Sequence, residues 1–231
     1  MENNSLKTLL KATALVSIML TASAGAAIDD NTLQVTGTVT PASCVPALSD
    51  EGIVNFGNTI SEKLTQKDNQ LPPKTLTFTI NCGHAAKVSL HMVDNNTAGH
   101  RLMVIKNAYH NDDDNKEAAY QFGIGKNSKG DAVGAYSVTI VGSPVANRDA
   151  TNVIVSAGGV WGYSQTHAFT NGTGVHALLS VAKPDGEIVP MAINTLEMTL
   201  RINAAVASNT DVEMTDAIDF DGSSTIVMTY L

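Results

Sequence analysis

Cys44 and Cys82 are the residues of this sequence whose chemistry is most specific. An even pair of cysteines in an exported chain is typical of a disulfide. A zinc site would need more ligands than two cysteines placed so far apart. We therefore expect a structural Cys44–Cys82 disulfide, and the chain-entropy relation gives it a stabilising effect of roughly 4 kcal/mol.

Three other segments resemble catalytic or ligand-binding motifs, but each lacks a residue that its motif needs. Gly123–Ser128 resembles a dinucleotide-binding loop without its last glycine and without a following helix. The acidic segment Asn111–Asn115 is followed by Lys116 where a calcium loop needs glycine, although weak cation binding there stays open. Gly162–Thr166 lacks the final glycine of a nucleophile elbow, and the six histidines show no close pair at metal-binding spacing. We expect no enzyme, no cofactor and no metal centre.

Residues 1–26 have the organisation of a secretory signal. Lys7 and Lys11 flank an apolar run, Ala12–Thr21, and the small residues Ala22–Ala26 offer cleavage sites. The apolar run is shorter than the roughly 20 residues that a membrane-spanning helix needs, so a transmembrane anchor is the less favoured alternative. We therefore expect an exported chain.

The composition excludes some classes of partner. The 231-residue chain has a formal charge of −8, and removal of Glu2, Lys7 and Lys11 with the signal subtracts a net +1 and gives −9. This acidic balance argues against nucleic acid and anionic membranes as partners. Hydrophobic residues make up 43% of the chain and aromatic residues only 5%, which predicts a mainly aliphatic core.

Short segments with period-two alternation dominate the sequence and are separated by Gly, Asn and Asp clusters, which is typical of an antiparallel sandwich or barrel. A single domain without long helices is expected, and Ser61–Asn69 is expected to form one helical turn before Pro72. The predicted strands are Leu33–Thr40, Ile53–Phe56, Thr75–Asn81, Lys87–Val93, Leu102–Ile105, Tyr120–Ile124, Ala135–Val141, Val153–Ser156, His176–Ala182, Thr195–Ala204 and Ser224–Leu231.

The two ends and the cysteine pair together resemble the pilin subunits of bacterial chaperone–usher fimbriae. The closest similarity is to the longer β-type fimbrial proteins once grouped as a domain of unknown function. About residues 94–175 form an enlarged middle region that departs from ordinary pilins. The resemblance rests on the alternating residues Leu33, Val35, Gly37 and Val39 ahead of Cys44, on Ile53–Gly57, on Leu76–Cys82, on Gly222 and on the penultimate Tyr230.

The resemblance implies an incomplete immunoglobulin-like β-sandwich that is completed by a donor strand from another molecule. It divides the chain into a signal peptide at 1–26, a donor-strand extension at 27–41 and one domain at 42–231. A periplasmic chaperone would first cover the open edge, and at an outer-membrane usher the extension of the next subunit would replace it. The implied partners are this chaperone, the usher, other fimbrial subunits and a host-surface glycan or protein, and the implied location is the cell surface.

The resemblance also assigns roles to residues at both ends. Leu33, Val35, Gly37 and Val39 would be the donor residues. The last strand would be the acceptor, with one of its two faces lining the groove. These faces carry Ile226, Met228 and Tyr230 on one side and Val227, Thr229 and Leu231 on the other.

The expected function is thus that of a structural subunit, polymerised by donor-strand exchange into a surface fibre used in adhesion. Three alternatives stay open. Residues 33–40 could be the first strand of the domain itself. The chain could instead be a minor adhesive subunit at the fibre tip. From a different class, it could be a freely secreted β-sandwich that binds carbohydrate.

Overall fold

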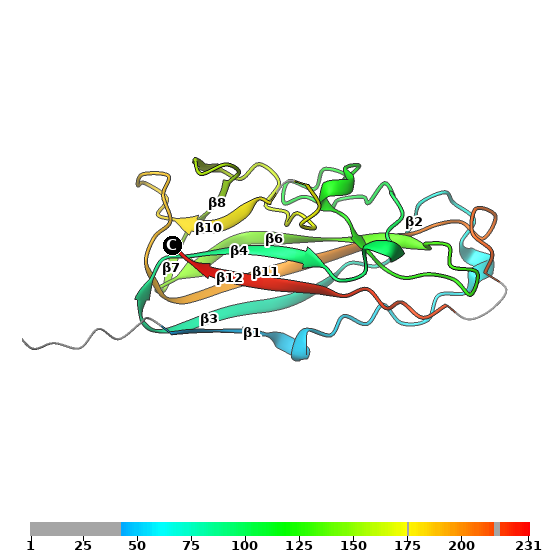
Figure 1. The fold of residues 1–231 in the computed structure, drawn as a ribbon, viewed down its shortest axis with the longest axis horizontal. Coiled ribbons are helices and arrows are strands. Elements are labelled where there is room, and N and C mark those ends of the chain that lie inside the picture. The colour runs from blue at the N-terminus through cyan, green and yellow to red at the C-terminus, as the bar shows by residue number, and fades with distance from the viewer. Residues whose placement is uncertain (1–42, 175, 215–217) are drawn as a thin grey trace, which may run out of the picture. The chain divides into compact units, whose positions relative to one another are not determined.

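Two antiparallel β-sheets face each other in the computed structural model, which describes residues 43–174, 176–214 and 218–231 (Figure 1). The described residues belong to one compact unit, Thr40–Leu231. Helical structure in them is limited to four 3₁₀ turns: η1 (Ser49–Gly52), η2 (Ser61–Lys63), η3 (Thr97–Gly99) and η4 (Ala118–Tyr120). The predicted all-β, two-sheet architecture is confirmed.

The first sheet, sheet A, has the strand order β1-β3-β11-β6-β5, with two short strands attached at its side. The second, sheet B, has the order β12-β4-β10-β8-β9. Sheet A contains β1 (Cys44–Leu48), β3 (Lys74–Ala86), β11 (Ile193–Val206), β6 (Gly134–Ala146) and β5 (Phe122–Gly123), with β2 (Asn69–Gln70) beside β11 and β7 (Asp149–Ala150) beside β6. Sheet B contains β12 (Ser224–Tyr230), β4 (Val88–Asp94), β10 (Leu178–Ala182), β8 (Asn152–Ser156) and β9 (Trp161–Tyr163).

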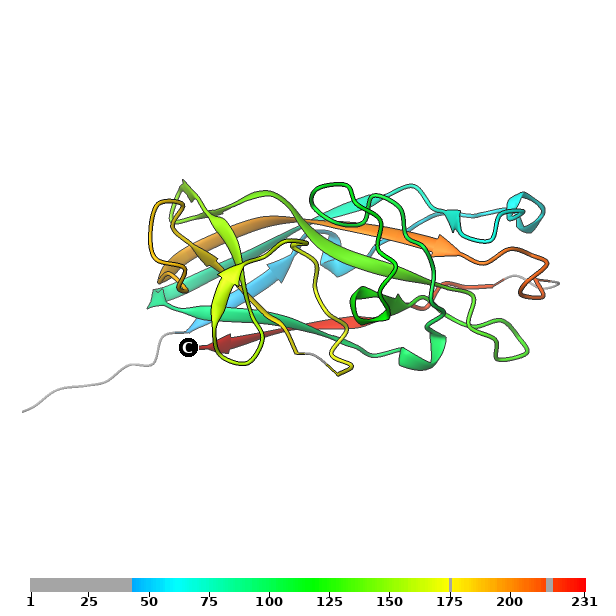
Figure 2. The same cartoon turned by 90° about the horizontal axis from the view of Figure 1, so that it is seen from above.

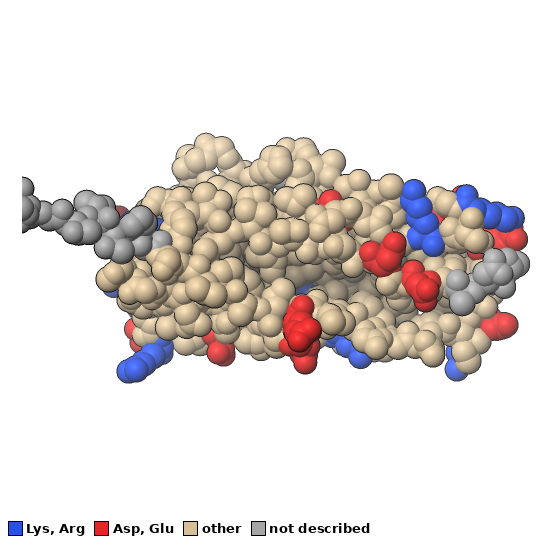
Figure 3. Space-filling view, turned by 60° about the horizontal axis from the view of Figure 1, so that its bottom comes forward, with Lys and Arg blue, Asp and Glu red and all other residues tan. Residues whose placement is uncertain are grey.

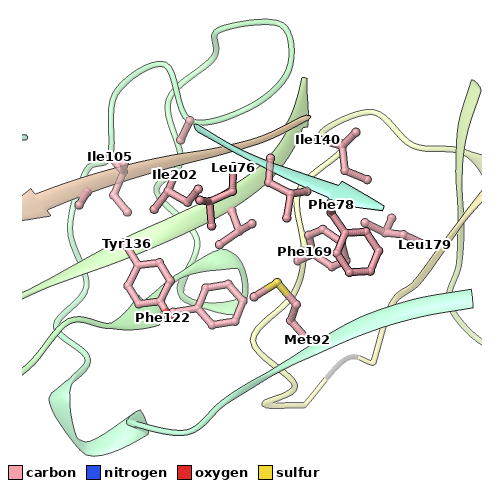
Figure 4. Close-up of a cluster of buried hydrophobic side chains, with 14 of the residues drawn as sticks. Leu76, Phe78, Met92, Ile105, Phe122, Tyr136, Ile140, Phe169, Leu179 and Ile202 are labelled. Atoms are coloured by element: carbon pink, nitrogen blue, oxygen red, sulfur yellow. The ribbon is translucent and has the colours of Figure 1, made fainter. Parts of the chain in front are cut away.

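Period-two alternation places the core between the sheets. In β3, Leu76, Phe78 and Ile80 are buried, whereas the threonines between them are only half-buried. β11 repeats this pattern with Leu196, Met198, Leu200 and Ile202. Figure 4 shows side chains of both sheets gathered in this cluster, among them Leu76 of β3 and Met92 of β4.

Polar side chains hold the long connections of the middle region onto sheet A. The Nη2 group of Arg201 on β11 donates to the carbonyl oxygen of Tyr109 at 2.6 Å, and its Nη1 group forms an ion pair with Asp112 at 2.8 Å. Asn203, two residues further along β11, donates to the carbonyl oxygen of Lys106 at 3.1 Å. The acidic segment Asn111–Asn115 is therefore tied to β11 through Asp112.

Two of the predicted strands are wrong. Ile53–Phe56 keeps its alternation, with Val54 and Phe56 turned partly inward, but it pairs with no strand among the described residues. Leu102–Ile105 makes only an isolated bridge, between Ile105 and Asn115. There the side-chain amide of Gln121 takes the position of a neighbouring strand, since it accepts the Met103 N–H at 3.0 Å and donates to the Met103 carbonyl at 2.7 Å.

The other predicted strands within the described residues overlap observed ones, although Tyr120–Ile124 shrinks to Phe122–Gly123. Within the predicted turn Ser61–Asn69, only Ser61–Lys63 forms a 3₁₀ turn, η2, and Asn69 begins β2. Four strands were not predicted: β1, β2, β7 and β9. The predicted signal peptide, the extension 27–41 and the strand Leu33–Thr40 lie outside the described residues. In the described part of the chain, no helix is both long enough and apolar enough to cross a bilayer.

Candidate functional site

The last strand leaves one of its edges without a strand partner among the described residues. β12 pairs only with β4, in a register that runs from Ser224↔Asp94 to Tyr230↔Val88 (Figure 2). β1 is likewise the edge strand of sheet A and pairs only with β3. Figure 1 shows both edge strands towards the lower side of the sandwich, where the Cys44 N–H at one end of β1 donates to the hydroxyl of Tyr230 on β12. The two sheets are therefore both open along this side.

The disulfide fixes the position of β1. Cys44 and Cys82 are directly opposite each other in the β1–β3 register, and the structure links them by a disulfide with a Cα–Cα distance of 3.9 Å. The crosslink expected from the sequence is confirmed. Leu48, at the other end of β1, packs against the core, so the strand is held at both ends.

A groove lies between this edge of sheet A and β12, and we call it the edge groove. It consists of two cavities of about 260 and 740 Å³ that share the side chains of Val54, Phe56 and Phe220. One wall is formed by residues between Leu48 and Leu64, and the other by described residues between Met214 and Ile226. Figure 3 shows a face of the molecule that is hollowed along its middle. The segment Ile53–Phe56, which pairs with no strand among the described residues, forms part of this wall.

The smaller cavity of the edge groove has an apolar floor, whereas the larger one is also lined by polar residues such as Asn58 and Ser61. The apolar floor is made of core side chains of both sheets: Leu76, Met92, Tyr136, Val138, Leu200 and Ile202. The ring of Tyr136 stacks on Phe122 with 5.3 Å between centroids, and burial raises the pKa of Tyr136 to about 12. An apolar floor beside a strand edge without a partner is suited to receiving a β-strand with alternating apolar side chains.

The rim of the edge groove carries negative charge. Asp50 and Glu51 are exposed at the η1 turn beside Leu48, and Asp219 and Asp221 are exposed on the segment before β12. Figure 3 shows acidic side chains beside the hollow. Such a rim favours the approach of a basic partner at low ionic strength.

The two faces of β12 differ in what they contact. Ile226 and Met228 pack against the core, and Ile226 also lines the edge groove. Tyr230 follows on the same face, 47% exposed, and its hydroxyl oxygen accepts the Cys44 N–H at 2.7 Å. Val227 is half-buried but does not line the groove, and Leu231 is exposed while its N–H donates to the Lys87 carbonyl. Of the two sets named from the sequence, the structure thus turns the Ile226 set inward.

Several groove residues were missed by the sequence analysis. Leu48 lies in an unpredicted strand, and Tyr136 was counted only as part of a strand. Phe220 and Ile218 precede β12 in the sequence Ile218-Asp-Phe-Asp221, whose period-two alternation was the available signal. The predicted donor residues Leu33, Val35, Gly37 and Val39 lie outside the described residues.

The motifs considered for chemistry bring together no cluster of metal-ligating side chains in the described residues. Gly123 ends β5, and no group of three or more His, Cys, Asp or Glu in the described part of the chain could hold a metal ion. One histidine pair does form, since the rings of His110 and His167 stack with 3.8 Å between centroids. Burial and the neighbouring His110 lower the pKa of His167 to about 4.

Comparison with known proteins assigns a family. A family model described as "Protein of unknown function (DUF1120)" matches residues 33–137. Protein GltF of Escherichia coli (strain K12) is 31% identical over 226 residues, which span 87% of this chain and 89% of GltF. The chain belongs to the DUF1120 family.

A second relative extends the similarity along nearly the whole chain. Uncharacterized protein YhcF of Escherichia coli (strain K12) is 24% identical over 245 residues, which span 99% of this chain and 100% of YhcF. The range that matches the DUF1120 family model begins at Leu33. It therefore contains the alternating segment ahead of Cys44, both cysteines and the wall of the edge groove from Leu48 to Leu64.

Proposed function

We propose that this protein is a structural subunit of a chaperone–usher fimbria and polymerises by donor-strand exchange. The observation that carries the proposal is the apolar floor of the edge groove, which lies beside an edge of β12 that has no strand partner among the described residues. An unpaired edge next to exposed apolar side chains promotes aggregation unless another strand covers it. In a subunit that exchanges strands, this open edge becomes the binding site for a strand of the next subunit.

The donor in this proposal is the alternating segment Leu33–Thr40 of a neighbouring subunit. Leu33, Val35 and Val39 supply apolar side chains for the groove, and Gly37 fits a shallow position in it. Burial of each aliphatic side chain contributes roughly 1.5–3 kcal/mol, and each main-chain hydrogen bond about 1 kcal/mol net. Ordering the strand costs roughly 1–2 kcal/mol per residue. The durability of the joint then comes from slow exchange.

Two accessory partners follow from the same proposal. A periplasmic chaperone covers the edge of β12 before assembly, and an outer-membrane usher is the place where the donor segment replaces it. The acidic rim at Asp50, Glu51, Asp219 and Asp221 supports a first partner with basic residues beside its inserted strand.

Thermal melting tests the proposal. An oxidised chain of residues 42–231 is heated with and without a peptide of residues 27–40. We expect a slow-onset rise in melting temperature, because the peptide supplies the missing strand. The matched control peptide carries Val35→Asp and Val39→Asp and should have no effect. A chain that melts cooperatively at high temperature and does not respond to the unmodified peptide would contradict the proposal and favour a freely secreted binding protein.

The same substitutions test assembly in the full chain. Val35→Asp or Val39→Asp should block polymerisation, while the acceptor domain keeps its fold and its melting temperature. Fibres of normal length from either variant, seen by electron microscopy, would show that Leu33–Thr40 is not the donor strand.

A further inference from the structure

A second cavity, of about 240 Å³, lies among the connections of the middle region and shares no lining residue with the edge groove. It lies where β4 ends, between three chain segments that are far apart in the sequence. We call it the loop pocket. Its walls are formed by Asp94, Thr97, His100, Ala118, Ala119, Asn171 and Thr173.

Hydrogen bonds between the three segments hold the walls of the loop pocket in place. The Asp94 N–H donates to the Asn171 carbonyl at 3.1 Å, and the Asn171 N–H donates to the Ala119 carbonyl at 2.8 Å. The side-chain amide of Asn171 donates in addition to the carbonyls of Ala118 and Gln121, each at 2.8 Å. The pocket is therefore pre-formed, which lowers the entropic cost of binding.

The carboxylate of Asp94, which lines this pocket, can accept further hydrogen bonds. The residue is 6% exposed, and its two carboxylate oxygens each accept one backbone N–H, from Asn96 at 2.8 Å and from Gly123 at 2.9 Å. Each carboxylate oxygen can accept a second hydrogen bond. No Lys or Arg of the described chain forms an ion pair with Asp94.

Three further polar groups belong to residues that line the loop pocket and have no hydrogen-bond partner in the described chain. The Nε2 atom of His100 is buried and has no hydrogen-bond partner in the described chain. The hydroxyls of Thr97 and Thr173 also make no hydrogen bond to another described residue, although the Thr173 N–H is bound by Asn171 at 2.9 Å. A buried polar atom without a partner costs free energy, and a ligand that supplies the partner regains it.

We propose that the loop pocket binds a neutral sugar ring. Each hydroxyl of a sugar can both donate and accept, as the threonine hydroxyls and the imidazole of the pocket can. The carboxylate of Asp94 accepts from two neighbouring sugar hydroxyls and repels anionic ligands. The small side chains of Ala118 and Ala119 leave room for the flat face of the ring. Because the pocket and the edge groove share no lining residue, the inference does not depend on fibre assembly.

Saturation-transfer NMR on the full exported chain tests the inference. The probes are glucose, galactose, mannose, fucose and N-acetylglucosamine, each at about 10 mM, a concentration that detects millimolar binding. We expect saturation transfer to at least one of these neutral sugars. Glucosamine and ethanolamine serve as cationic probes. Absence of transfer to every neutral sugar, with or without transfer to a cationic probe, would overturn the proposal.

Two conservative variants locate the binding site. Thr97→Val and Thr173→Val keep the side-chain shape and remove one hydroxyl each, so each should weaken binding about three- to tenfold. Thr199→Val, on an exposed position of β11, is the matched control and should bind as the parent does. Melting temperatures of all three variants establish that they fold. Parent-like affinity in a Thr97→Val/Thr173→Val double variant would place the sugar elsewhere and refute the assignment.

Discussion

The backbone N–H of Cys44 donates a hydrogen bond of 2.7 Å to the hydroxyl oxygen of Tyr230, across 186 residues of sequence. This contact joins the first described strand of sheet A to the last strand of sheet B. The cavities of the edge groove end at Leu48 and Ile226, before this contact is reached. Tyr230 therefore joins the two edge strands beyond the end of the groove, and a strand that pairs with β12 as far as Tyr230 would meet this contact.

Tyr230→Phe removes only the hydroxyl that makes this contact. We expect the free energy of unfolding to fall by about 1 kcal/mol or less, because the hydrogen bond is partly exposed to solvent. Urea titration measures the change. Tyr163→Phe on β9 is the control, because the Tyr163 hydroxyl has no hydrogen-bond partner in the described chain and its ring is 43% exposed. Equal losses in both variants would mean that the Cys44–Tyr230 hydrogen bond contributes nothing.

Replacement of both cysteines tests how strongly the disulfide holds β1. The Cys44→Ala/Cys82→Ala variant should lose about 2–4 kcal/mol of stability, chiefly because the unfolded chain gains freedom. Urea unfolding of the variant and of the oxidised parent gives the difference. Addition of a reductant should destabilise the parent and leave the variant unchanged. If the reductant affects both equally, the effect does not come from this disulfide.

Gly222→Ala tests how closely the backbone at Gly222 packs against Tyr136 and Gly123 in the edge groove. A Cβ atom at Gly222 would lie 2.9 Å from Cε1 of Tyr136 and 3.0 Å from the Gly123 carbonyl oxygen. We expect a loss of about 1–3 kcal/mol, because the backbone contact cannot relax easily. Gly162→Ala is the matched control, since a Cβ atom at Gly162 would have no neighbouring atom within 4 Å. A Gly222→Ala variant as stable as Gly162→Ala would exclude tight packing at this point.

His167 should make stability depend on pH below neutrality. Its pKa is lowered in the folded protein, from 6.5 to about 4, so the folded state holds the neutral ring. The contribution of His167 to the free energy of unfolding is fully present above pH 6.5. It is lost as the pH falls towards 4, because the unfolded state then binds a proton that the folded state does not. The urea concentration at the midpoint of unfolding should therefore decrease as the pH is lowered from 6.5 towards 4.

His167→Asn is the variant that isolates this effect. The residue has a φ of +54°, a left-handed conformation that asparagine tolerates better than most residues. The variant should therefore keep the turn and show a flatter dependence between pH 6.5 and 5, above the range where carboxylates titrate. A dependence equal to that of the parent would assign the titration to another group.

The long strands of the core were predictable from sequence because their alternation is local. Thr195–Ala204 shows apolar residues at every second position, and the structure places this segment in β11. β1 was missed because Val45-Pro46-Ala47 does not alternate. Proline is tolerated at Pro46 since β1 is an edge strand, whose outward backbone groups need no partner in the sheet.

The edge groove was predictable only in part. The sequence marked both faces of the last strand as apolar, so it offered no way to choose between Ile226 with Met228 and Val227 with Leu231. The choice depends on how β12 packs against sheet A, which is a contact between distant segments. The stacking of His110 on His167 and the loop pocket could not be predicted for the same reason, because both bring together residues that are far apart in the chain.

The disulfide also determines what a protease would leave behind. Cys44 and Cys82 enclose the whole wall of the edge groove from Leu48 to Leu64, including the exposed residues Asn55 and Gly57–Ile60. A single cut within this exposed stretch would leave both fragments covalently joined. A nicked subunit would therefore migrate as one species on a non-reducing gel and separate into two on a reducing gel, while most of its sandwich stays assembled.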